Sequence, residues 1–160
     1  MSTTQSRRRG DASTLSAGSR SLRLRLAHLD QDQADLERAR DLLRQGSAAA
    51  ADDPREAFEL VHRAALRGAG VLVARANRDR RRKLPLNVWT ALERLGGPDA
   101  ERASRLTPLV AERVRLDRDP TAMPDPQLLR QHLEQTGEHL EEISERVLAD
   151  LPAHMTALAG

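Results

Sequence analysis

The chain has 160 residues, of which 39% are hydrophobic and 31% charged, so it has the size and composition of one soluble domain with a core of four or five helices. It has no cysteine, which excludes disulfides and thiolate zinc sites, and no apolar run of the roughly 18 residues that a membrane span needs. The net charge is only +2, although the pI is about 10.2. The pI is high because all but one of the 26 basic residues are arginine, and a high pI of this origin is weak evidence for a nucleic-acid partner. The N-terminal arginines are not followed by the apolar stretch that a secretory signal requires. We therefore expect a cytoplasmic protein.

The N-terminal residues differ in composition from the rest of the chain. Residues 1–20 are rich in Ser, Thr, Gly and Arg with almost no apolar residues, which predicts a disordered basic arm. From Ser21 leucines recur every seven residues, as on one face of a helix, and Gly46 can end that helix. We therefore predict an arm, a helical bundle domain at residues 21–151 and a flexible C-terminal tail at residues 152–160.

The second predicted helix has the composition of a central bundle helix. Asp52 or Asp53 can cap its N-terminus, and Pro54 suits the first helical position. The helix continues to about Asn77, with apolar residues around most of its circumference and small residues that let neighbours approach closely. These features predict an all-α, up-and-down bundle of four to five helices with the second helix at its centre.

A cluster of cations follows this helix. Residues 75–83 carry six basic groups and one acid, and the candidate phosphate- and nucleic-acid-binding residues among them are Arg78, Arg80, Arg81, Arg82 and Lys83. The alternative is a solvated loop whose arginines keep it soluble or pair with the acidic last helix. Because no aromatic residue is interleaved with the cations, stacking on single-stranded bases is not expected.

Two shorter helices are expected next. Asn87 can cap a helix that carries the only tryptophan, Trp89, and two glycines follow it. The following helix runs from Pro98 to about Asp117, and we expect a kink at Pro108 because proline removes a helical hydrogen bond.

The last predicted helix is acidic. It starts near Pro126, after a proline-containing loop at residues 119–125. Residues 117–160 carry three arginines against nine acids. Together with the basic cluster this predicts a charge dipole, which could steer a partner or bring unlike ends of two subunits together.

The five histidines form no metal-binding motif. His132 and His139 share a helix face but are seven residues apart, too far to ligate one metal ion, and there is no HExxH or Cys/His cluster. We predict no metal and no cofactor, and we expect the histidines at the surface or at an interface.

One pair of residues is a candidate for catalysis. Arg55 and His62 lie near the start of the second helix, separated by six residues. An arginine that holds a phosphate and a histidine that transfers a proton are the minimum for metal-independent RNA cleavage. In so arginine-rich a chain, chance pairs of this kind are expected.

The order of these features resembles a known family. The run ADDPREAFELVHRAALRGAGVLVARA, the basic loop, the tryptophan-bearing PLNVWTALERL and a long terminal helix resemble the small HEPN-domain proteins of actinobacteria typified by the SAV_6107 family. The resemblance covers about Leu22–Val147. It implies a HEPN-like bundle, often dimeric, in a superfamily that includes toxin ribonucleases, nucleotidyltransferase partners and non-catalytic RNA-associated members.

The resemblance also implies where a ribonuclease motif should lie. Ribonucleases of the superfamily carry Arg-x4–6-His near the start of the last core helix, whereas here Arg130 precedes His132 by two residues and His139 by nine. This departure favours a non-catalytic interaction module, homodimeric and associated with RNA or with a protein partner such as a nucleotidyltransferase or DNA-repair enzyme. The alternatives are a ribonuclease that uses Arg55 and His62, and an accessory nucleic-acid-binding protein that uses the basic cluster.

Overall fold

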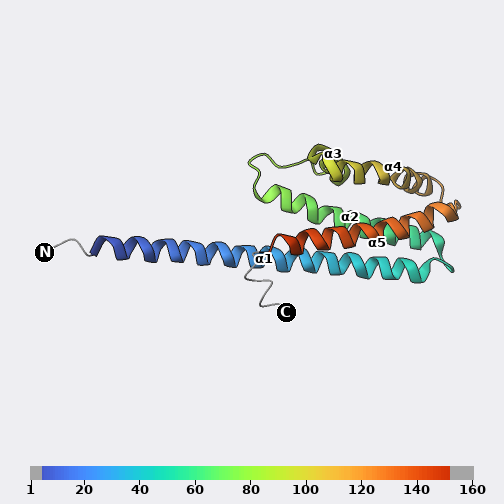
Figure 1. Cartoon of the computed structure of the whole chain (residues 1–160). Coiled ribbons are helices and arrows are strands. Elements are labelled where there is room, and N and C mark those ends of the chain that lie inside the picture. The colour runs from blue at the N-terminus through green and yellow to red at the C-terminus, as the bar shows by residue number, and fades with distance from the viewer. Residues whose placement is uncertain (1–4, 152–160) are drawn as a thin grey trace. The chain divides into compact units, whose positions relative to one another are not determined.

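All the regular elements that the computed structural model describes are α-helices (Figure 1). It describes residues 5–151, with side chains at residue 14 and from residue 16 onward, and no strand occurs in that range. The predicted all-α fold is confirmed. The predicted C-terminal tail, residues 152–160, and the first four residues of the predicted arm lie outside the described residues. The helices are α1 (Gln5–Ala49), α2 (Pro54–Arg78), α3 (Val88–Leu95), α4 (Gly97–Arg118) and α5 (Pro126–Ala149).

The chain divides into two compact units, Met1–Ala34 and Asp35–Gly160. The first unit contains the N-terminal part of α1. This helix begins at Gln5, upstream of Ser21, where the leucine spacing first indicates a helix. Residues 5–20 have too few apolar side chains for a hydrophobic period to mark them as helical.

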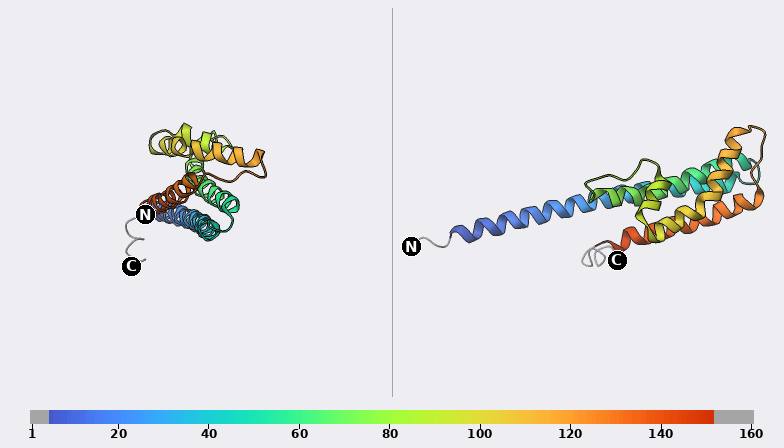
Figure 2. Two further views of the ribbon diagram at one scale, coloured as in Figure 1. Left: turned by 90° about the vertical axis from the view of Figure 1, so that its right-hand side faces the viewer. Right: turned by 90° about the horizontal axis from the view of Figure 1, so that it is seen from above.

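In the second unit α2 is the central helix, as predicted. It packs along α5, and α3 and α4 pack on each other and on α2, to one side of it (Figure 2). Gly68 permits the close approach of α5, because an added Cβ there would lie 2.5 Å from Cδ2 of Leu140. The small residues of α2 therefore serve helix packing.

Side-chain caps begin three of these helices. Asp53 caps α2 through a 3.1 Å hydrogen bond from a backbone N–H three residues later, and Asn87 caps α3 in the same way at 3.0 Å. Asp125 caps α5 by accepting from two backbone N–H groups, at 2.8 and 3.1 Å. These caps satisfy donors that a helix N-terminus otherwise leaves unpaired.

The hydrophobic core of the second unit is built mostly from leucine, alanine and one aromatic residue. Phe58 of α2 is 1% exposed and packs with leucines of α4 and α5, and half-buried Trp89 of α3 lies against the same cluster. Helix α4 continues through Pro108 as one helix. None of the described helices has the length and apolar character needed to cross a membrane.

Candidate functional site

The predicted basic cluster lies at the end of α2 and in the loop that leads to α3. Arg80, Arg81, Arg82 and Lys83 are exposed, whereas Arg78 is half-buried. Asn77 holds the loop, because its side-chain Oδ1 accepts from the backbone N–H of Leu84 at 2.9 Å and its backbone carbonyl accepts from Lys83 Nζ. Leu84 is buried, so the loop is anchored at its end while the arginines remain in solvent.

Arg55 supports the structure of a neighbouring turn. Its guanidinium donates to three backbone carbonyls: Leu116 at 3.0 Å, Asp119 at 3.0 Å and Ala122 at 2.7 Å. These carbonyls belong to the last turn of α4 and the loop after it. A cation is favourable there because the C-terminus of a helix carries partial negative charge.

His62 lies two turns further along α2 and is 3% exposed. Its ring contacts Trp89 and His132, with ring centroids 6.2 and 5.8 Å apart, in edge-on arrangements. Burial, and secondarily the nearby charge of Arg113, lower the pKa of His62 to about 4. The imidazole is therefore neutral at physiological pH and enclosed by the bundle.

Arg55 and His62 consequently have different surroundings. The open hollow beside Arg55, of about 410 Å³, is lined by two arginines and four acids, and His62 is not among its lining residues. One of those acids, Glu59, binds Arg113 through two hydrogen bonds of 3.0 and 3.1 Å, and this pairing lowers the pKa of Glu59. Glu59 is thus ionised at neutral pH, and the acidic lining disfavours a bound phosphate.

The two histidines of α5 are buried, and the prediction that they lie at the surface or at an interface was wrong. His132 is 0% exposed, with its ring 5.1 Å from that of Phe58 and its Nδ1 3.2 Å from the hydroxyl of Thr136. His139 is 5% exposed. Burial lowers the pKa of each to about 3, and the positive charge of Arg102 adds to the effect at His139. Seven residues are two helical turns, so both rings lie on the face that α5 packs against its neighbours.

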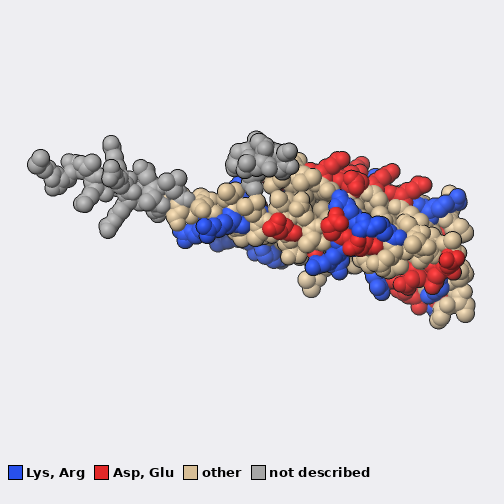
Figure 3. Space-filling model, turned by 90° about the horizontal axis from the view of Figure 1, so that it is seen from below, with Lys and Arg blue, Asp and Glu red and all other residues tan. Residues whose placement is uncertain are grey.

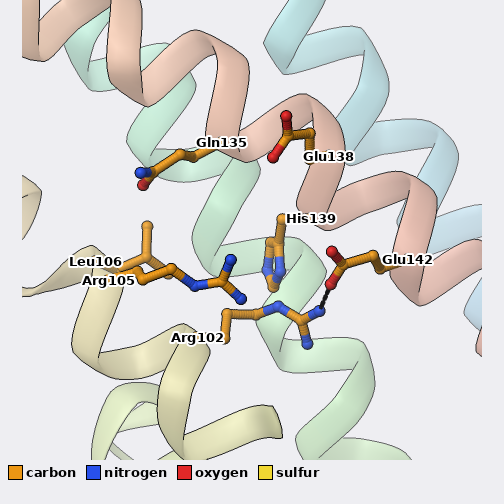
Figure 4. Close-up of a pocket in the computed structure, with 7 residues that line it drawn as sticks. All are labelled: Arg102, Arg105, Leu106, Gln135, Glu138, His139 and Glu142. Atoms are coloured by element: carbon orange, nitrogen blue, oxygen red, sulfur yellow. Dashed lines mark hydrogen bonds and ion pairs between the residues drawn. The ribbon is translucent and has the colours of Figure 1, made fainter.

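A polar seam between α4 and α5 surrounds His139 (Figure 4). Arg102, only 5% exposed, binds Glu142 of α5 and donates to Asp99 at 3.3 Å, while Arg146 of α5 donates to Asp99 at 2.7 Å. The hollow here measures about 20 Å³, room for a group the size of one water molecule. The seam joins the two helices and is too small to enclose a nucleotide. Sequence reasoning missed it, although Asp99 and Arg102 have the i,i+3 spacing of a helical ion pair.

Metal ligation has no geometric support within the described part of the chain. No three side chains of His, Cys, Asp or Glu converge there as a metal ion would require.

The comparison with protein families decides the family. The family model for SAV_6107-like HEPN domains matches residues 48–144, more than half of the chain. The chain belongs to this HEPN family. No curated protein and no solved structure matches it.

The matched part of this HEPN protein runs from the end of α1 into α5. It includes the basic loop, the buried histidines and the acidic hollow beside Arg55. Most of α1 lies outside the match, so the N-terminal unit is a feature of this chain that the family match does not describe.

Proposed function

We propose that this HEPN protein is a non-catalytic interaction module that works by contacting a partner rather than by cleaving RNA. The arrangement around Arg55 carries the proposal. Its guanidinium is engaged by three backbone carbonyls, the hollow beside it is acidic, and His62 is enclosed elsewhere in the bundle. A general base has to reach the proton that it removes, and an Arg–His phosphate site needs both groups at one point. The partner is RNA or a nucleotide-handling protein such as a nucleotidyltransferase, and the module is a homodimer.

A cleavage assay tests this proposal. We expect purified protein incubated with single-stranded RNA to produce no fragments above those of a mock preparation, and His62→Asn to behave identically. Circular dichroism of both proteins would verify that the variant is folded. Cleavage by the native protein that disappears in His62→Asn would instead establish the ribonuclease alternative.

Exposure of the basic loop favours a second candidate function, in which the module binds nucleic acid. Four consecutive cations, Arg80–Lys83, are held in solvent by a loop with a buried anchor. Because no aromatic side chain stands among them, binding would be electrostatic and indifferent to sequence.

Filter binding to single-stranded RNA at several salt concentrations tests the loop. The Arg80→Gln/Arg81→Gln/Arg82→Gln variant is expected to bind more weakly, with the slope of log K against log salt reduced by about two, because roughly 0.7 counterions are released per neutralised phosphate. The matched control replaces three scattered, exposed arginines by Gln: Arg94, Arg118 and Arg130. Equal losses in both variants would reject the loop as the binding site, since only net charge would then matter.

A further inference from the structure

An apolar groove lies where the turn between α1 and α2 meets the start of α5. It is open, measures about 450 Å³, and has only one charged residue in its lining, Arg130. Leu129 forms part of it and is buried, while Met123 at its edge is 56% exposed. Methionine is flexible and common at surfaces that adapt to apolar partners. The remaining lining residues are Ala50, Ala51, Pro54, Pro124, Pro126 and Leu133.

Exposed carboxylates flank this groove. Asp52 and Asp53 lie in the chain between two lining residues, and Asp125 lies between two others. Asp53 and Asp125 accept helix-capping hydrogen bonds, which require the carboxylate oxygens and keep them in place. An apolar groove with an acidic rim is complementary to a helix that carries apolar residues beside cations.

Such a helix is present in the same chain, within the first unit. Residues 14–29, which we call the leucine–arginine segment, lie in α1 and contain no acidic residue. Leu22, Leu24 and Leu26 are exposed by 36%, 58% and 36%. The arginines of the segment are exposed at positions 20, 23 and 25, and basic groups lie along this part of α1 on the face that Figure 3 shows.

Exposed leucines on a helix indicate an uncovered contact surface. A helix with little packing is marginally stable in water, and most helical stability in proteins comes from burying an apolar face. Two leucine–arginine segments are unfavourable partners for each other, because like charges would be brought together. The acidic groove offers both the apolar lining and the opposite charge.

We propose that the leucine–arginine segment of one copy docks into the apolar groove of a second copy, reciprocally, so that two identical contacts form a closed homodimer. This inference rests on the proposed homodimeric module and adds the surface that makes it. Leu22 and Leu26, one helical turn apart on the same face of α1, enter the groove between the prolines and Met123. The arginines pair with the acidic rim, which also sets the orientation of the segment.

A pair of charge-reversed variants tests the contact in the full-length protein. The segment variant is Arg20→Glu/Arg23→Glu/Arg25→Glu, and the groove variant is Asp52→Arg/Met123→Arg. Each variant brings like charges together in its own homodimer, whereas a mixture of the two restores opposite charges at both contacts. The matched control, Arg80→Glu/Arg81→Glu/Arg82→Glu, makes the same change of charge in the basic loop.

Light scattering at tens of micromolar is expected to show a dimer for the native protein and the control. Each of the two variants alone is expected to be a monomer, and their equimolar mixture a heterodimer. A dimeric native protein whose variants stay dimeric, or whose mixture stays monomeric, would overturn this docking mode and leave the homodimer standing. A monomeric native protein would overturn both. Loss of RNA binding in the segment variant with no change of mass would assign the arginines to nucleic acid and also reject the docking.

Discussion

Acidification to about pH 5 is expected to lower the folding stability of this HEPN protein by several kcal/mol, because three histidines are buried in their neutral form. His62, His132 and His139 are at most 5% exposed, and burial lowers their pKa values to about 4, 3 and 3. In the unfolded chain each has a pKa of about 6.5. The unfolded state therefore binds more protons between these values, and stability is complete above about pH 6.5 and falls as the pH drops towards 4 and then 3.

The expected size of this effect is large. Each histidine loses about 2 kcal/mol of its contribution between about pH 6.5 and pH 5, since one pKa unit corresponds to about 1.4 kcal/mol. Three such losses amount to about 6 kcal/mol, comparable with the total unfolding free energy of many domains, about 5–15 kcal/mol.

Urea unfolding followed by circular dichroism from about pH 7.5 to pH 5 measures this dependence. His132→Leu removes one of the three titrating rings and should reduce the slope of the unfolding free energy against pH by about one third. An unfolding free energy that is flat across this range would contradict the buried neutral histidines.

Arg55→Ala is expected to destabilise the protein by about 3 kcal/mol. The substitution removes three hydrogen bonds to the end of α4 and the following loop, two of them partly buried. A charged hydrogen bond typically contributes about 1.5–3 kcal/mol, and an unpaired buried carbonyl adds a desolvation cost, whereas new water contacts at the exposed bond offset part of the loss. Arg55→Lys should recover only part of the stability, because an ammonium lacks the planar fork that reaches several carbonyls.

The same urea titration compares these variants with Arg94→Ala, which removes an exposed arginine from α3. Surface changes of that kind usually alter the unfolding free energy by less than about 0.5 kcal/mol. If Arg55→Ala were as stable as Arg94→Ala, the bonds to the loop would contribute nothing, and a role in ligand binding would become the better interpretation of Arg55.

Local features of the fold could be predicted from the sequence because their causes lie within a few residues of one another. The caps at Asp53 and Asn87 act three residues along the chain, and the apolar circumference of α2 is a matter of helical period. The start of α1 could not be predicted in the same way, because residues 5–20 form a helix that lacks the apolar stripe from which a helix is recognised in a sequence.

The sequence by itself determined the helical class, the central helix, the basic loop and the resemblance to a HEPN family. Only the tertiary structure decided what the candidate residues do. The carbonyls that engage Arg55 belong to residues 61–67 positions away, and the rings around His62 come from α3 and α5. The apolar groove likewise combines two segments that are far apart in the sequence, residues 50–54 and 123–133. Such contacts depend on how helices pack, and the spacing of residues along the chain carries no information about them.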